Sequence, residues 1–310
     1  MITKGAYYNK TLLYLSMRSS IVVWLFDLAA HLPLSTLHRL GALLGWMTYW
    51  LSGNYARRLR ENLRYEMGNC PEENFRQVLS ASIAEAGKGV AELPWLWCRS
   101  LEEIVPSVKM CHGWEHVEAA RARGKGIIFL TPHLGCFEIS ATYAAESIPI
   151  TVLYRPPKLA WLEAVMRSGR EHGQIRLART DVSGVRLLYK ALKRGEAIGL
   201  LPDQVPGKGE GEWADFFGRP AYTMTLVGRL AESSGATVLM AYAERLPKGV
   251  GYIIHITPLE FVANLPVTRQ INAALEKVVR ACPTQYLWSY NRYKIPAGIE
   301  PPTPHERKTA

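Results

Sequence analysis

The chain has 310 residues, 48% of them hydrophobic, and carries 37 basic against 27 acidic side chains, for a net charge of +10. This composition excludes a disordered chain, and the length allows one large core plus an accessory segment. The positive charge favours anionic partners, namely membrane surfaces, phosphorylated lipids, acidic carrier proteins or nucleic acid. Because the sequence has neither zinc-finger spacing nor an RNA-binding aromatic signature, nucleic acid is not an expected partner.

The amino-terminal region is richer in apolar and aromatic side chains than a soluble domain needs. Residues 40–56 carry no charge over 17 positions and include interface-favouring Trp and Tyr rings, yet at roughly 25 Å they fall short of a bilayer core of about 30 Å. Residues 19–37 are long enough only if Asp27, His31 and Pro33 are tolerated. The sequence therefore predicts membrane association but leaves open one span, a monotopic hairpin or two interfacial helices.

Two other interpretations of this region compete with membrane association. A cleaved signal peptide is disfavoured, because the uncharged run over 19–26 ends at Asp27 and a second apolar segment follows. Ordinary buried helices of a soluble protein stay a weaker alternative. Basic residues on both sides, Lys4, Lys10 and Arg18 before and Arg57, Arg58 and Arg60 after, favour a cytoplasmic or headgroup-facing position for both flanks.

Beyond this region, the apolar periodicity predicts helices that alternate with strands. A helix is expected over 72–96. Strands are predicted near 126–131, 149–154, 174–177, 196–201, 236–244 and 251–257. Further helices are predicted near 113–123, 138–146, 158–171, 183–194, 223–234 and 268–281, several ending at a glycine. This alternation predicts an α/β fold with a mainly parallel sheet and helices on both faces.

The remaining segments complete a four-part division of the chain. Residues 205–220 are rich in Gly and charge and are expected to form a long, functional loop, whereas Tyr286, Trp288 and Tyr290 alternate as in a half-buried strand that packs into the core. We predict membrane-associating helices over 1–56, a helical lead-in over 57–123, an α/β domain over 124–297 and a flexible tail over 298–310.

His133 and Glu138 carry the strongest chemical signal, because they directly follow a buried apolar run. The carboxyl ends of such strands are where α/β sheets place their chemistry. The two side chains can meet if His133 lies in a turn and Glu138 in the first turn of the next helix. A neutral imidazole oriented by a carboxylate can take a proton from a hydroxyl. The competing interpretation is a strand-capping His and a Glu that complements the helix dipole.

Other polar residues fall near the same predicted edge of the sheet. Arg155 follows the second predicted strand and suits phosphate or an oxyanion, with a surface ion pair as its alternative. Asp203 and Gln204 follow the strand over 196–201. Asp203 is expected either to order Arg155 or a backbone turn, or simply to cap the end of the strand. Three further basic residues are Arg176, Arg179 and Arg186. They either form a basic rim for a phosphorylated acceptor or are simply solvated charges.

Cysteine and histidine spacing does not predict a metal site or a thiol nucleophile. The five cysteines are widely spaced without a C-x-x-C pair, so reduced thiols are expected. Cys136 lies inside the His133 box and is expected to pack as a small apolar residue. His112 and His116 are spaced i, i+4, but without an evident third ligand they are predicted to lie on a solvated helix face.

From residue 124 onwards, the chain resembles the late acyltransferases of lipid A biosynthesis, the lauroyl and myristoyl transferase family within the glycerolipid acyltransferase superfamily. An amino-terminal apolar helix region is also expected of that family, which extends the resemblance over nearly the whole chain. The blocks that carry it, in order, are His133-x4-Glu138, Tyr154-Arg155-Pro156, Leu200-Leu201-Pro202-Asp203-Gln204, residues 216–221 and residues 285–290.

The resemblance implies transfer of a fatty acyl chain from acyl-acyl carrier protein to a 3-hydroxyacyl hydroxyl of the lipid A precursor. His133 is then expected as general base and Glu138 as its partner, with Arg155, Asp203, Gln204, Arg176 and Arg179 in substrate binding. No metal or organic cofactor is expected, and the location implied is the cytoplasmic face of a bacterial inner membrane. The alternatives are an acyltransferase on another lipid or glycolipid hydroxyl and a non-catalytic lipid-binding membrane protein.

Overall fold

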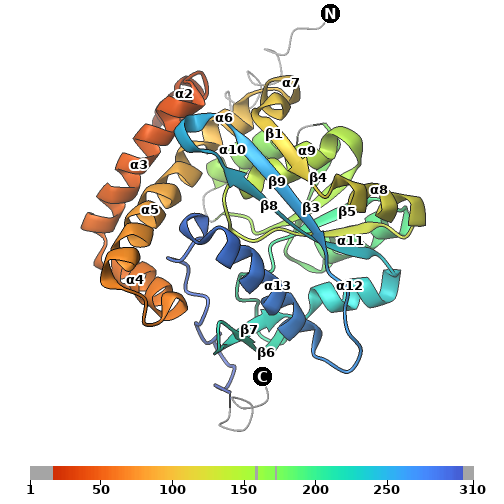
Figure 1. Ribbon diagram of the computed structural model, residues 1–310. Helices are drawn as coiled ribbons and strands as arrows, with labels where there is room; N and C mark the ends of the chain where they lie inside the picture. Colours follow the sequence, from red (N-terminus) through yellow and green to blue (C-terminus); the bar gives the residue numbers. More distant parts are fainter. Residues whose placement is uncertain (1–16, 158–159, 172, 303–310) are drawn as a thin grey trace, which may run out of the picture.

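A computed structural model describes residues 17–157, 160–171 and 173–302, and its centre is a seven-stranded sheet (Figure 1). The strand order is β1-β9-β8-β2-β5-β3-β4, and every neighbouring pair is parallel except β8 with β9. This confirms the predicted mainly parallel sheet. The strands are β1 (Val108–His112), β2 (Ile127–Leu130), β3 (Ile150–Tyr154), β4 (Ile175–Arg179), β5 (Ala197–Leu200), β8 (Thr237–Arg245) and β9 (Tyr252–Pro258).

Helices cover both faces of this sheet, as the alternation predicted. Successive side chains of a strand point to opposite faces, so Ile127 and Phe129 of β2 enter one core and Ile128 and Leu130 the other. The first core is covered by α6 (Leu93–Cys98), α7 (Leu101–Ile104), α8 (Trp114–Arg123), α9 (Phe137–Ser147) and α10 (Ala160–Arg170). The second is covered by α11 (Val182–Lys193), α12 (Leu226–Ser234) and α13 (Val267–Ala281).

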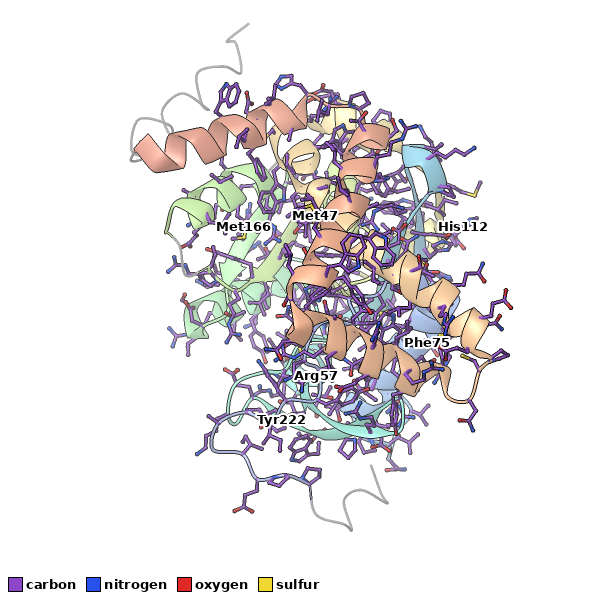
Figure 2. The ribbon with its side chains drawn as sticks, turned by 90° about the vertical axis from the view of Figure 1, so that its left-hand side faces the viewer. Met47, Arg57, Phe75, His112, Met166 and Tyr222 are labelled. Carbon is purple, nitrogen blue, oxygen red and sulfur yellow. The ribbon has the colours of Figure 1, made fainter. Side chains whose placement is uncertain are left out.

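Four amino-terminal helices lie along one side of the molecule (Figures 1 and 2). They are α2 (Met17–Ala30), α3 (Leu34–Leu51), α4 (Gly53–Met67) and α5 (Glu72–Ala91). Helices α3 and α5 cross at backbone contact, because a Cβ on Gly87 of α5 would lie 1.9 Å from the carbonyl oxygen of Gly41. Within the described residues, no helix is both long and apolar enough to cross a membrane.

A buried ion-pair cluster fastens these helices to the sheet. Arg245 of β8 donates to both carboxylate oxygens of Glu92, at 2.9 and 2.5 Å, and to Glu85 of α5 at 2.8 Å. The Tyr252 hydroxyl donates to Glu92 at 3.0 Å, and His38 of α3 lies 3.3 Å from the same carboxylate. Burial alone raises the pKa of Glu92, but the charge and hydrogen bonds of Arg245 outweigh burial and lower it to about 2.

Several predicted elements differ from the structure. Pro94 lacks an N–H, and the helix expected over 72–96 is divided into α5 and α6. The expected loop over 205–220 contains most of an antiparallel hairpin, β6 (Gly211–Phe216) and β7 (Arg219–Met224), which also shortens the helix expected over 223–234. After the short helix η3 (Pro283–Gln285), Tyr286 makes a single β-bridge with Leu134 and the chain then turns at 288–290, so the expected strand does not form, although Tyr286 and Trp288 are buried as predicted.

Strand β1 was not predicted, and it lies at the edge of the sheet after the short helix η1 (Val105–Ser107), while η2 (Pro247–Gly249) links β8 to β9. The predictions for residues 1–16, 158–159 and 303–310 fall outside the described residues.

Candidate active site

His133 and Asp203 meet at the carboxyl edge of the sheet because their strands are neighbours. Leu130, the last residue of β2, pairs in register with Leu200, the last residue of β5. His133 and Asp203 each follow their strand end by three residues. The His133 Nδ1 lies 2.8 Å from Asp203 Oδ1, and the His133 backbone N–H donates to Oδ2 at 2.9 Å. Both carboxylate oxygens are therefore used to hold one histidine.

The charge of Asp203 is governed by its burial and by its contacts with His133. Asp203 is 2% exposed, and burial by itself raises the pKa of its carboxyl group. The positive charge of a protonated His133 and the hydrogen bonds from that residue outweigh burial, so the pKa lies below its ordinary value. A carboxylate that stays ionised at neutral pH can orient an imidazole and stabilise its protonated form.

Gln204 completes the surroundings of the imidazole. Its Nε2 lies 3.1 Å from His133 Nε2, which suits an amide that donates to the lone pair of that nitrogen. With Nδ1–H directed at Asp203, this assigns the neutral tautomer whose Nε2 is the proton acceptor. The Val205 backbone N–H donates to the Tyr290 hydroxyl at 3.0 Å, which fixes the chain directly after Gln204.

Glu138 lies where the sequence placed it, in the first turn of α9, but it has other partners than His133. Arg170 of α10 donates to Glu138 through Nε at 2.9 Å and also through Nη2, and Trp97 Nε1 donates at 3.4 Å. The predicted His133–Glu138 contact is therefore wrong. In the described residues, the carboxylate that orients His133 is Asp203, while Glu138 joins α9 to α10 and α6.

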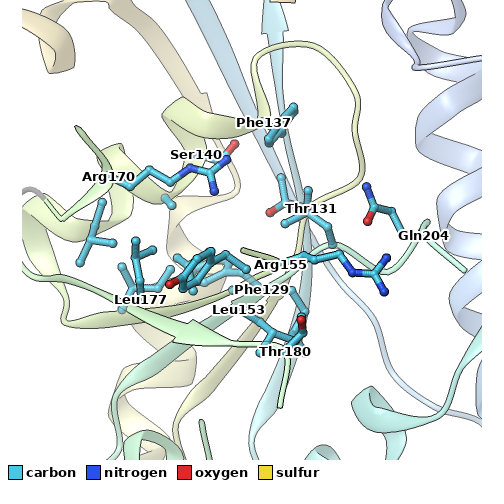
Figure 3. A pocket seen from close by; sticks show the side chains of 18 of the residues that line it. Phe129, Thr131, Phe137, Ser140, Leu153, Arg155, Arg170, Leu177, Thr180 and Gln204 are labelled. Atoms are coloured by element: carbon cyan, nitrogen blue, oxygen red, sulfur yellow. The ribbon is translucent and has the colours of Figure 1, made fainter. Parts of the chain in front are cut away.

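These groups border one large cavity of about 880 Å³. Figure 3 shows Arg170 and Ser140 at one end, Arg155 and Gln204 at the other, and Phe129 and Thr131 between them. The apolar wall runs along β2, β3 and β4 beneath α6 and α10, and includes Trp97, Phe129, Ile150, Val152, Met166 and Leu177. A cavity of this size and lining suits a long apolar chain that ends at a polar group.

Apart from Asp203, which contacts His133 and is not among the residues that line the cavity, the predicted substrate-binding residues separate into two groups. Arg155, after β3, and Gln204 line the cavity with His133 and Glu138. Arg176 and Arg179 of β4 are instead paired with carboxylates, Arg176 with Glu196 at 3.7 Å and Arg179 with Glu163 at 2.5 Å. Neither of these two arginines is among the residues that line the cavity.

Other sequence interpretations are also decided by the contacts. Cys136 is 1% exposed, and burial raises the pKa of its thiol well above the ordinary value, which agrees with apolar packing. His112 ends β1 whereas His116 lies in α8, so the two do not share a helix face. The His112 ring instead stacks on His255 with 5.4 Å between centroids. Within the described residues, no three potential ligands are grouped to hold a metal ion.

Sequence reasoning missed three side chains of the cavity. Trp97 and Arg170 contact Glu138 although they lie 41 and 32 residues from it in the chain. No local sequence pattern predicts contacts over such separations. Arg229 of α12 also lines the cavity. Gly169, directly before Arg170 in α10, lets this helix approach α6, because a Cβ on Gly169 would lie 2.2 Å from the Cβ of Trp97.

A family model described as bacterial lipid A biosynthesis acyltransferase matches residues 8–295, which is nearly the whole chain. The chain belongs to this family. The resemblance seen in the ordered sequence blocks is thereby confirmed, and the reaction class of the family is acyl transfer in lipid A biosynthesis.

Individual relatives extend over most of the chain. A lipid A biosynthesis lauroyltransferase of Escherichia coli K12 is 28% identical over 90% of this chain and 91% of its own length. A palmitoleoyltransferase of the same organism is 25% identical, with 89% and 90% covered, and a myristoyltransferase is 26% identical, with 84% and 82% covered. The names of these three relatives differ in the acyl chain transferred.

Proposed function

We propose that this chain transfers a fatty acyl group from an acyl carrier protein thioester to a hydroxyl of a 3-hydroxyacyl chain on a lipid A precursor. The observation that carries the proposal is the imidazole of His133, which lines a cavity with an apolar wall while Asp203 holds Nδ1 and Nε2 contacts the Gln204 amide. Membership of the lipid A acyltransferase family supports the acceptor class.

The chemistry follows from the two nitrogens of His133. The acceptor hydroxyl takes the place of the Gln204 amide at Nε2 and gives its proton to that nitrogen while its oxygen attacks the thioester carbonyl. The carbonyl carbon–sulfur bond then breaks, and the thiolate leaves with the proton from the imidazolium. Asp203 stabilises the imidazolium throughout, so the reaction requires neither an acyl-enzyme nor a metal.

Charge develops on the thioester oxygen during the attack and needs donors. Figure 3 shows the Gln204 amide and the Arg155 guanidinium projecting on the same side of the cavity, and we assign the oxyanion to these two groups. Glu138 has a different role in this scheme. Paired with Arg170, it holds α10 in place as a wall of the chain-binding part of the cavity.

The amino-terminal helices support a position at the cytoplasmic surface of the bacterial inner membrane. Figure 2 shows Met47 on α3 and Arg57 on the following helix, on the side formed by the amino-terminal helices. Apolar side chains exposed on α2 and α3 are Trp24, Leu25, Leu28, Leu40, Leu43, Leu44, Met47, Trp50 and Leu51. Apolar residues beside the arginines of α4 are the combination that binds anionic headgroups.

The deciding experiment measures the lipid product. Detergent-purified protein is incubated with an acyl carrier protein thioester and a tetra-acylated, Kdo-bearing lipid A precursor, and the lipid mass is read beside a His133→Ala control. We expect one added acyl group with the unaltered protein and none with the variant, which should keep its fold because His133 is partly exposed at the sheet edge. Near-normal turnover by His133→Ala would refute the mechanism, and no product with any chain length would refute the acceptor.

A further inference from the structure

Two arginines outside the proposed reaction centre line the cavity without an acidic partner. Arg186 lies on α11 and Arg229 on α12, two helices that contact each other, and both side chains are exposed. Across the described residues, neither guanidinium has an ion pair or a hydrogen bond, in contrast to Arg176 and Arg179, which have carboxylate partners. We call Arg186 and Arg229 the arginine pair.

The carboxylates that line the same cavity are already bound elsewhere. Glu138 is paired with Arg170, and Asp181 accepts from the Ser183 hydroxyl at 2.6 Å and from the Gly184 N–H at 2.9 Å. Glu210 accepts the Gly207 N–H at 2.9 Å. The arginine pair therefore adds two cations that no carboxylate of the cavity wall neutralises.

We propose that the arginine pair is a phosphate-binding site at the mouth of the cavity. Planar guanidinium groups match the geometry of phosphate oxygens, and two of them on separate helices can hold one phosphate from two directions. The loop that continues from Gln204 also lines this cavity, through Pro206, Gly207 and Gly209. The site is distinct from His133 and serves binding only.

This inference rests on the proposed function, in which two substrates carry phosphate. The donor carries it as the phosphodiester of the carrier's thioester arm, and the acceptor carries it on its sugar. The chemistry recognised is the same in both cases. The experiment must therefore separate the two sources, and it must also separate a failure of the site from a failure of the proposed reaction.

The test variant is Arg186→Gln with Arg229→Gln, and its matched control is Arg121→Gln with Lys277→Gln. Arg121 on α8 and Lys277 on α13 are exposed cations outside the cavity lining, so the control removes the same charge. Donors are the carrier thioester and an acyl-N-acetylcysteamine, which lacks phosphate. Acceptors are the lipid A precursor with and without its sugar phosphates.

We expect the KM of one phosphate-bearing substrate to rise by at least about tenfold in the test variant, because a hydrogen-bonded ion pair to phosphate is lost. The KM of the corresponding phosphate-free substrate and that of the control variant should not change. A rise confined to the carrier thioester assigns the site to the donor, and one confined to the phosphorylated acceptor assigns it to the acceptor. Equal effects with and without phosphate would overturn the site.

A second readout does not depend on turnover. Inorganic phosphate, compared with chloride at equal ionic strength, should raise the Tm of the unaltered protein and of the control variant but not that of the test variant. An equal response of all three proteins would contradict a phosphate site. If the unaltered protein transfers no acyl group from any donor, the proposed reaction fails, while this titration still decides the site.

Discussion

The His133–Asp203 pair makes a sharp prediction about charge. Asp203→Asn keeps a side chain of the same shape but removes the charge that stabilises the imidazolium, and it allows the amide to favour the other tautomer. We expect kcat to fall by about 10³-fold while the KM values change little. Steady-state kinetics beside circular dichroism would check this, and a variant with unaltered kcat would show that Asp203 does not act on the base.

Glu138 and Arg170 predict a different outcome, because they pair with each other rather than with His133. Each single reversal, Glu138→Arg or Arg170→Glu, leaves like charges in a partly buried place and should lower activity and Tm. The double reversal restores the pair and should recover much of both. If Glu138 instead acts on His133, the double variant will be as inactive as Glu138→Arg alone, which thermal denaturation and product mass together can distinguish.

Single residues were located well from the sequence, but their partners were not. His133 in a turn and Glu138 in the next helical turn were predicted, and so was Asp203 at a strand end. What the chain does not reveal is that β5 lies beside β2, since 66 residues and two other strands separate Leu130 from Ala197. Once the register Leu130 to Leu200 is known, the pairing of the residues three positions later follows.

At the scale of elements, the apolar pattern predicted every strand of the seven-stranded sheet except β1. Strand β1 lies at the sheet edge, and its Lys109 and Met110 are exposed, so it lacks the pattern of a buried strand. The β6–β7 hairpin was not predicted, because the glycines and charged residues over 205–220 are typical of a loop. It turns at Phe217 and Gly218, both with positive φ, and a phenylalanine at such a position is an unusual turn signal.

The cluster around Arg245 predicts the effect of acid and of one substitution. In the folded protein Glu92 has a pKa of about 2, below its value in the unfolded chain. The ionised Glu92 therefore contributes its full stabilisation of the fold at pH values above the ordinary pKa of a glutamate. This stabilisation is lost as pH falls from about 4.5 towards 2. Glu92→Gln should lower the free energy of unfolding by about 3 kcal/mol at neutral pH.

Chemical denaturation at neutral and acidic pH would measure both effects. The difference in stability between Glu92→Gln and the unaltered protein should shrink as the pH is lowered. Protonation of Glu92 then removes, in the unaltered protein, the same negative charge that the substitution has already removed from the variant. A difference that is constant over this range would mean that Glu92 contributes through packing rather than charge. Glu72→Gln, at an exposed ion pair with Arg64 and Arg76, is the control and should change stability little.

For the molecule as a whole, the apolar side formed by α2 and α3 predicts vesicle binding. Leu43 and Trp50 are 55% and 69% exposed, so Leu43→Ser with Trp50→Ser should spare the core. We expect this variant to lose most binding to anionic vesicles in a flotation assay, while Val262→Ser, at an exposed loop residue, keeps it. Equal flotation of all three proteins would contradict the proposed membrane side.

The amino-terminal sequence predicted apolar helices without deciding how they are placed. Residues 40–56 fall short of the thickness of a bilayer core, and within the described part of the chain α3 ends at Leu51 and α4 begins at Gly53. The placement depends on contacts far along the chain, namely Gly87 against Gly41 and Arg245 against Glu92. Periodicity reports which side of a helix is apolar, but not what covers it.

The backbone contact between α3 and α5 also has a mechanical consequence. Glycines at this crossing leave no compressible side chains between the helices, and the Arg245 cluster ties the same helices to the sheet that holds His133. The apolar side of α2 and α3 and the imidazole of His133 therefore belong to one tightly packed unit. On the membrane proposed above, the distance between the apolar side and His133 could therefore not change unless these contacts broke.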